Sequence, residues 1–358
     1  MLPVPNQDLL ETTNMESTLF PKITKVLDVL YNMKRDKRTN RDTTAMVPLV
    51  GTVKLHGTHA DIVITNNDNI SLQSRNRQLT LESDNYDFAR KMAPKRAAIL
   101  NLKKLYLARY KEVNPTTKLD PSSPFILAGE WIGQGIQKRV AIDKLTRRFV
   151  IVSAYINGAW VQDLDYAHIA DEKEEIYNIS RSGFYHATLD LANPADSTRK
   201  LMEYTDAVEK ECPFAATFGV KGQGEGIVWK IQPRLDDPRF WFKTKAEQFL
   251  TSVHSKVKAE SDAINKLDKR QRVAPFAVQV VTERRLEQGV EYLDEFNLPK
   301  DKRSVGAYVK WLTSDVEVEE KREIEEMGID VKLLRAEVSR LGHEWFMRNN
   351  YGKGKRKH

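Results

Sequence analysis

Residues 47–58 read VPLVGTVKLHGT, an apolar run that ends in Lys54 and leads into a glycine-containing turn. A second apolar run begins at Ala60, so this stretch predicts two strands joined just after Lys54. A lysine at a strand end either extends its ammonium group into water or takes part in a reaction. Burial and neighbouring cations both lower the pKa of an ammonium group, which makes a lysine nucleophilic near neutral pH. Lys54 is therefore a candidate nucleophile.

The first 250 residues mix short apolar runs with one long helical stretch. That stretch covers residues 84–112 and is interrupted at Pro94, and an N-terminal helix of about three turns follows Pro21. Such a mixture predicts an α+β domain of antiparallel sheets with helices packed outside. The expected strands are residues 47–54, 60–65, 70–74, 125–131, 148–157, 226–232 and 239–243.

The strand signals stop after Phe249, and the rest of the sequence favours helices. Residues 317–327 and 331–347 have helical patterns separated by Gly328. We therefore predict two domains, residues 1–250 and a mainly helical region, residues 251–358, which ends in a basic tail.

The composition is that of an ordinary globular protein. Apolar residues make up 41% of the 358 residues, enough for two packed cores. The single cysteine, Cys212, excludes an intramolecular disulfide and a thiolate metal cluster. The sequence has no apolar stretch near the ~18 residues of a membrane span, and the polar N-terminus lacks a signal-peptide core. We expect an intracellular protein, cytoplasmic by default, with no membrane partner.

The formal net charge of +7 is compatible with a polyanionic partner but does not require one. Neither half of the chain has the composition of a basic arm, so a nucleic-acid surface must come from folding. No protein partner can be predicted from the sequence. Two short basic segments, residues 34–41 and the tail 353–357, are expected to be solvated or disordered.

Two arginines follow the strand expected at residues 70–74. The run SRNR places Arg75 and Arg77 in a turn, where their guanidinium groups present fixed donors suited to phosphate or ribose oxygens. The alternative is a pair of surface arginines beside Glu82 and Asp84.

A carboxylate lies near the end of another apolar strand. Glu130 stands in the run AGEWIGQG, residues 128–135, whose glycines permit close approach of the backbone. A buried glutamate needs a partner, so either an ion pair or a ligand contact is expected.

The region 222–245 combines a carboxylate with three lysines. Glu225 and Lys230 are five residues apart, so they face one site only if the strand begins after Gly226 or twists. Lys243 and Lys245 lie on the same face of an extended segment, which their repulsion disfavours unless an anion lies between them. The glycines are not a P-loop, because no Gly-Lys-Ser/Thr ending follows them.

Five motifs occur in order: KLHGT (54–58), SR (74–75), GEWIGQGIQK (129–138), EGIVWK (225–230) and KTK (243–245). Together they resemble the covalent nucleotidyltransferases, which include DNA ligases, RNA ligases and mRNA capping enzymes. The His-Gly-Thr run and the glycines after Glu130 resemble the branch with the second RNA ligase of phage T4 and the trypanosome RNA-editing ligases. The resemblance implies an ATP-grasp-like nucleotidyltransferase domain over roughly residues 20–250.

The resemblance implies four catalytic lysines. Lys54 would attack the α-phosphorus of ATP, expel pyrophosphate and form a lysyl-adenylate. Lys243 and Lys245 would hold the α-phosphate, and Lys230 would orient the phosphates and keep Lys54 deprotonated. AMP would then move to an RNA 5'-phosphate, and an RNA 3'-hydroxyl would displace it.

The resemblance also implies a nucleotide site with a metal. Glu130 would accept from the ribose, Arg75 would contact the nucleotide or the RNA 5'-phosphate, and Glu225 would organise a hydrated Mg²⁺ or Mn²⁺ through water. His56 either orients a phosphate or nicked strand or stabilises the turn. The implied nucleotide-binding residues are Leu55, His56, Arg75, Glu130, Val152, Glu225, Lys230, Lys243 and Lys245.

One position departs from the family pattern. Val152 stands where the family has an aromatic residue that stacks on adenine, and Ser153 stands in place of an acidic residue. Either the purine lies on an aliphatic surface, or Phe149 or Tyr155 substitutes. Strand alternation predicts that these two rings face away from Val152.

The C-terminal region bears on the substrate. DNA ligases and capping enzymes usually append an OB-fold, a small β-barrel, whereas residues 250–358 favour helices. The resemblance therefore favours an RNA ligase that joins 3'-hydroxyl and 5'-phosphate ends, at nicks or bridged ends, with the helical region binding RNA. The alternatives are a capping-type guanylyltransferase that uses GTP and a DNA ligase.

Overall fold

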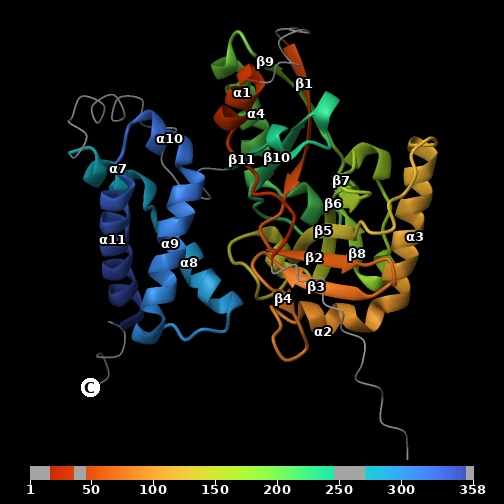
Figure 1. Ribbon diagram of the computed structural model, residues 1–358, viewed down its shortest axis with the longest axis horizontal. Coiled ribbons are helices and arrows are strands. Elements are labelled where there is room, and N and C mark those ends of the chain that lie inside the picture. Colours follow the sequence, from red (N-terminus) through yellow and green to blue (C-terminus); the bar gives the residue numbers. More distant parts are fainter. Residues whose placement is uncertain (1–16, 36–45, 246–270, 352–358) are drawn as a thin grey trace, which may run out of the picture. The chain divides into compact units, whose positions relative to one another are not determined.

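The computed structural model describes residues 17–35, 46–245 and 271–351 (Figure 1). The chain folds into two compact units, each built from three separate segments of the sequence. Unit 1 contains Met1–Lys22, Gly57–Gln137 and Thr146–Asn178, and unit 2 contains Ile23–His56, Lys138–Leu145 and Ile179–His358. The predicted boundary near residue 250 lies outside the described residues.

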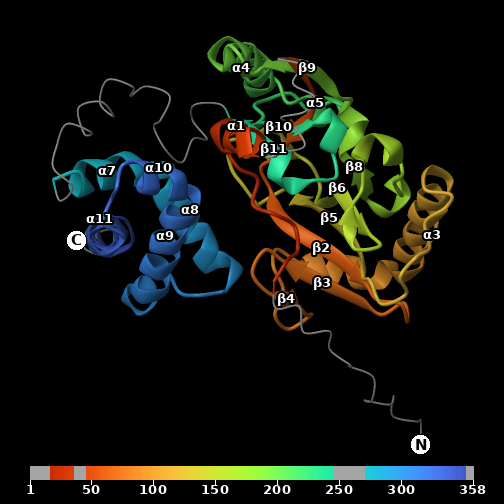
Figure 2. The ribbon, with the colours of Figure 1, turned by 45° about the horizontal axis from the view of Figure 1, so that its top comes forward.

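Unit 2 contains a four-stranded antiparallel sheet, which we call sheet A. Its strands run in the order β11 (Trp241–Lys245), β10 (Gly226–Ile231), β1 (Met46–Lys54) and β9 (Tyr185–Asp190). Helix α4 (Pro194–Lys210) packs against this sheet (Figures 1 and 2). The buried hydroxyl of Thr244 joins the two layers, since it lies 2.6 Å from the Thr205 hydroxyl and accepts from the Trp229 indole at 3.0 Å.

Unit 1 contains a seven-stranded sheet, which we call sheet B. Six strands run in order along it, and β8 (Ile176–Asn178) pairs in parallel with β6. All the other strand pairs of sheet B are antiparallel. The six are β4 (Gln78–Leu79), β3 (Ile70–Ser74), β2 (Thr58–Ile64), β5 (Phe125–Ile132), β6 (Arg148–Ile156) and β7 (Ala159–Trp160).

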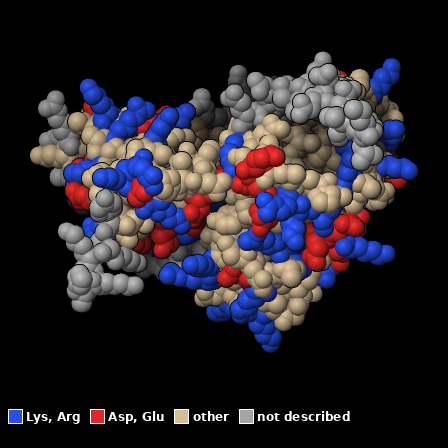
Figure 3. Space-filling model, turned by 90° about the horizontal axis from the view of Figure 1, so that it is seen from below, with Lys and Arg blue, Asp and Glu red and all other residues tan. Residues whose placement is uncertain are grey.

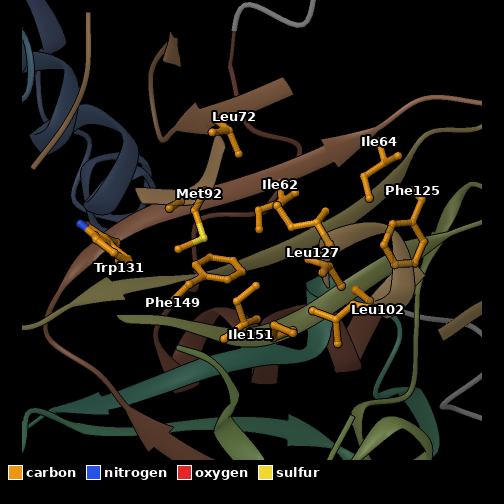
Figure 4. Close-up of a cluster of buried hydrophobic side chains, with 14 of the residues drawn as sticks. Ile62, Ile64, Leu72, Met92, Leu102, Phe125, Leu127, Trp131, Phe149 and Ile151 are labelled. Atoms are coloured by element: carbon orange, nitrogen blue, oxygen red, sulfur yellow. The ribbon is translucent and has the colours of Figure 1, made fainter. Parts of the chain in front are cut away.

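Helices α2 (Phe88–Met92) and α3 (Arg96–Val113) cover one face of sheet B. A short 3₁₀ turn at Ala93–Lys95 joins them, so the interruption at Pro94 is observed as predicted. The layer between helices and sheet is apolar, and Figure 4 shows Met92 and Leu102 of the helices among side chains of β2, β5 and β6.

A β-bulge interrupts the pairing of β5 with β6. Gly129 pairs with Ile151 and Ala128 pairs with Ser153, so Val152 has no partner in β5. The bulge reverses the side-chain alternation, because Phe149 and Ile151 lie in the apolar layer before it, and Ala154 and Ile156 lie there after it. Uninterrupted alternation predicted that Tyr155 shares the face of Phe149. Because of the bulge, the two rings lie on opposite faces.

The described part of the C-terminal region, residues 271–351, contains helices and no strand. Its core includes Phe276, Tyr308, Leu312 and Val338, all fully buried. This confirms the predicted helical character and the separation at Gly328. The helices are α7 (Val273–Val280), α8 (Glu283–Glu295), α9 (Val305–Glu319), α10 (Lys321–Glu326) and α11 (Val331–Tyr351).

The α+β prediction is confirmed, with small differences in the elements. The N-terminal helix is α1 (Val26–Arg35), and β11 begins at Trp241 because Pro238–Phe240 form a 3₁₀ turn. Strand β9 was not predicted. No helix in the described ranges is both long enough and apolar enough to cross a membrane.

Candidate active site

Four lysines share one face of sheet A. Lys54 and Lys245 are both register partners of Gly226, one on each side of β10. Lys243 pairs with Val228 two residues along, and Lys230 lies two residues further. Because side chains alternate, all four ammonium groups project to the same side. The other face of β10 is apolar, with Ile227, Trp229 and Ile231 buried.

Glu225 is the anion between these cations. Its carboxylate lies 2.7 Å from Lys54 Nζ and 3.0 Å from Lys245 Nζ, and His56 Nδ1 lies at 3.4 Å. Only 2% of the Glu225 side chain is exposed, against 22% for Lys54. Burial alone would raise the pKa of the Glu225 carboxyl, but Lys245, Lys54 and His56 outweigh it and hold that pKa well below its usual range. Glu225 is therefore ionised and shared by two lysines.

Gly226 makes this arrangement possible. A Cβ at this position would lie 2.1 Å from the carbonyl oxygen of Thr244, so any larger residue would push β10 away from β11. Strand β10 begins at Gly226, and Glu225 precedes it. The alternation rule therefore does not apply to Glu225, and its side chain reaches Lys54 and Lys245, which share the face of Lys230.

Lys230 packs over an aromatic ring. Its Nζ lies 3.6 Å from the centroid of the Trp241 ring, a cation–π contact that orients the side chain, which is 7% exposed. The neighbouring Leu55 is buried.

Two residues of the helical region contact this cluster, and sequence analysis did not find either. Both carboxylate oxygens of Glu319 in α9 lie 3.4 Å from Lys243 Nζ. Arg284 of α8 lies 2.8 Å from His56 Nε2 and pairs with Glu291 at 2.9 Å. Both contacts join residues more than 70 positions apart, and no local pattern marks such pairs.

Unit 1 holds the other predicted binding residues. Arg75 donates from Nη1 to the carbonyl oxygen of Phe20 at 2.8 Å and lies over the Phe20 ring. Glu130 accepts from the amide of Gly57 at 3.0 Å. Val152 is half-buried at the bulge. Within unit 1 the structure thus gives Arg75 and Glu130 defined partners.

A buried polar cluster in unit 1 was missed by sequence analysis. His59 Nε2 lies 2.9 Å from Asp61 in β2, and the Thr18 hydroxyl bonds to both side chains. Burial, and then the charge of Arg75, lower the pKa of His59, while Asp61 acts in the opposite direction. The ring of Phe20 stacks on His59 with the centroids 5.2 Å apart. The segment before the first helix is therefore anchored on β2.

The comparisons with known proteins assign the family. The RNA ligase family model matches residues 47–245, more than half of the chain, and that range contains all five motifs. The chain belongs to the RNA ligase family. A search of the curated proteins found no match.

Solved structures of RNA ligases from Naegleria gruberi are similar to this family member. The enzyme with PPi is 17% identical over 67% of this chain and 61% of that chain, with a TM-score of 0.39. A lysine-to-alanine mutant with ATP and Mn is 15% identical over 66% of this chain and 59% of that one, with a TM-score of 0.40. This RNA ligase family member thus spans about three fifths of their length. The narrower branch expected from His56 stays a prediction.

The residues around Glu225 suit a hydrated metal ion. Among the described residues no three His, Cys, Asp or Glu side chains gather in a way that could hold a metal directly. Mg²⁺ commonly keeps several waters and binds through one or two carboxylates together with substrate phosphates. The single ionised carboxylate of Glu225 fits that mode.

Proposed function

We propose that this RNA ligase family member is an ATP-dependent enzyme that joins RNA 3'-hydroxyl and 5'-phosphate ends through a lysyl-adenylate on Lys54. The observation that supports this proposal is the Lys54–Glu225–Lys245 cluster on the cationic face of sheet A. A nucleophilic lysine needs surroundings that stabilise phosphate charge, and the cations beside Lys54 supply them.

The shared carboxylate explains how Lys54 can react. Lys54 reacts as the free amine, after its ammonium group has released one proton to solvent. An N–P bond to the α-phosphorus forms, the P–O bond to pyrophosphate breaks, and the nitrogen releases a second proton and keeps one. Lys54 then has no charge, but Glu225 stays paired with Lys245 at 3.0 Å. The buried carboxylate is never left uncompensated, which would cost several kcal/mol.

The other lysines supply electrostatic stabilisation. Lys243 and Lys245 lie two residues apart on one face of β11, where they would hold the oxygens of the α-phosphate. Lys230, fixed over Trp241, would orient the remaining phosphates. Bound Mg²⁺ or Mn²⁺ would neutralise phosphate charge, and Glu225 would hold it through water.

In unit 1, Arg75 and Glu130 would bind the nucleotide. Glu130 would accept from the ribose hydroxyl, and Arg75 would offer its guanidinium group to the nucleotide or to the RNA 5'-phosphate. Leu55, His56 and Val152 complete the proposed binding residues. The helical C-terminal region would bind RNA.

Incubation with labelled ATP or labelled GTP and Mg²⁺, followed by denaturing gel electrophoresis, tests the proposal. We expect a covalent adenylate with ATP. A covalent guanylate in its place would indicate a capping-type activity, and the absence of both adducts would contradict the proposal. Sealing assays on nicked RNA and nicked DNA then separate an RNA ligase from a DNA ligase.

A further inference from the structure

The segment Phe88–Val113, which forms α2 and α3, is strongly basic. It contains eight lysines and arginines and one acidic residue, Glu112. Its net charge of +7 equals that of the whole chain, so the charges of all the other residues balance. On the face that Figure 3 shows, basic and acidic side chains are interspersed in small groups. The eight are Arg90, Lys91, Lys95, Arg96, Lys103, Lys104, Arg109 and Lys111.

Helix α3 holds part of this charge on a rigid support. Ile99, Leu102 and Tyr106 on its inner side are buried against sheet B. Arg96, Lys104 and Lys111 follow one another at spacings of eight and seven residues, so they form a stripe along another side of the helix. At 1.5 Å per residue the stripe is about 22 Å long.

Four of the other five basic residues of the segment have acidic neighbours. Lys103 pairs with Asp68 at 2.7 Å and Arg109 with Glu112 at 3.0 Å. Lys95 pairs with Glu174 at 3.6 Å and Arg90 with Asp87 at 3.7 Å.

The stripe itself is different. Arg96, Lys104 and Lys111 are exposed, and none of them has an ion pair with any residue in the described ranges. Lys91 of α2 is also exposed and has no ion pair with a residue in the described ranges. These cations are hydrated and accompanied by counterions, which a polyanion would release on binding.

We propose that Arg96, Lys104 and Lys111 form a surface that binds the phosphate backbone of the RNA substrate, a role that rests on the proposed function. Duplex nucleic acid presents about one phosphate per 1.7 Å, so a stripe of about 22 Å faces on the order of ten phosphates. Ammonium and guanidinium groups on a helix contact phosphates without reading bases. The surface therefore adds affinity that is independent of sequence and sensitive to salt.

Helix α4 provides a matched control. It is 17 residues long, against 18 for α3, and it also has one exposed arginine and two exposed lysines, Arg199, Lys200 and Lys210. It contains four acidic residues, so its net charge is negative. Replacing the three cations of either helix with glutamine changes the charge of the protein equally.

The experiment compares two full-length variants with the wild type. One is Arg96→Gln/Lys104→Gln/Lys111→Gln and the other is Arg199→Gln/Lys200→Gln/Lys210→Gln. Fluorescence anisotropy with a labelled nicked RNA duplex, over a range of KCl concentrations, gives Kd and its salt dependence. Lysyl-adenylate formation from ATP without RNA is measured on the same preparations.

We expect the α3 variant to bind the RNA about tenfold or more weakly, with the slope of log Kd against log salt reduced by about three. Its adenylate formation stays within twofold of the wild type, and the α4 variant binds RNA as the wild type does. Equal weakening in both variants, or an unchanged Kd in the α3 variant, would overturn the inference. If the α3 variant lost binding to phosphatidylserine vesicles while its RNA affinity stayed unchanged, the inference would also be overturned. That result would indicate that the stripe binds a membrane.

The failure of the proposed function has a separate signature. A wild type that forms no adenylate with ATP contradicts the ligase proposal, whatever the α3 variant does. Normal adenylate formation with unchanged RNA affinity in the α3 variant contradicts only the role of the stripe.

Discussion

Sheets A and B each carry buried charged groups, but they arrange them in opposite ways. On sheet A, Lys54 and Lys245 converge on one carboxylate, Glu225, so positive charge is in excess. On sheet B, His59 and Asp61 pair with each other, and the Thr18 hydroxyl bonds to both. Excess positive charge stabilises a phosphoryl transition state, whereas polar groups that pair with one another hold a shape. We therefore expect substitutions on sheet A to change the rate of adenylation and substitutions in unit 1 to change nucleotide affinity.

The largest effect is expected for Lys54→Ala. Without the amine no N–P bond to AMP forms, so adenylate formation and sealing of ordinary 5'-phosphate RNA fall below detection. RNA whose 5' end already bears AMP needs no lysyl-adenylate, and we expect its sealing to persist within about tenfold. Lys200→Ala on α4 serves as the control and should behave like the wild type. Sealing of ordinary RNA by the Lys54→Ala variant would rule out this role.

A paired substitution separates the two sheets. Glu225→Gln leaves Lys54 and Lys245 without their anion, and we expect the adenylation rate at saturating ATP to fall about 100-fold. Glu130→Gln keeps an acceptor for the Gly57 amide but removes a charge from the proposed ribose contact. We expect the Kd for ATP to rise about fivefold to tenfold, with the rate within about twofold. Single-turnover kinetics measure both quantities, and the reverse pattern would refute the division.

Stability should depend on pH through Glu225. The pKa of this buried carboxyl is lower in the folded protein than in the unfolded chain, so its ionised form stabilises the fold above the unfolded value, near 4.5. That contribution is lost as the pH falls toward the folded pKa. In urea unfolding followed by tryptophan fluorescence, the free energy of unfolding of the wild type should fall more than that of Glu225→Gln between about pH 5 and pH 3. Parallel curves would contradict the assignment.

The smallest effect is expected for Glu319→Gln. The Glu319 carboxylate lies 3.4 Å from Lys243 Nζ, where it competes with phosphate for the ammonium. Removing its charge should tighten ATP binding about twofold to fivefold, the range of an exposed or partly exposed ion pair. Equilibrium binding of ATP to the two proteins measures the change. Weaker binding would mean that Glu319 holds Lys243 in place for the nucleotide.

Sequence reasoning succeeded where alternation was unbroken. Lys243 and Lys245 were predicted on one face of an extended segment, and β11 places them so, with Glu225 as the anion beside Lys245. It failed at Val152, because nothing in the local sequence marks the bulge that reverses the alternation of β6. Strand β9 was missed because three of its six residues are polar or charged at this edge of sheet A, which leaves only a short apolar pattern.

Long-range contacts could not be predicted from local patterns. Lys54 and Glu225 are 171 residues apart, and only the pairing of β1 with β10 brings them to 2.7 Å. The basic character of α3 was present in the sequence but was averaged out over each half of the chain. Its significance depends on which of its cations pair with acidic residues in the described part of the fold, as Lys103 does and Lys104 does not.

The most direct test of the central claim is to locate the nucleotide on the protein. The wild type is incubated with ATP and Mg²⁺ without RNA, digested with trypsin, and its peptides are analysed by mass spectrometry. We predict one AMP, linked through an acid-labile N–P bond to Lys54. AMP on Lys230, Lys243 or Lys245, or no adduct in protein that binds ATP, would contradict the account.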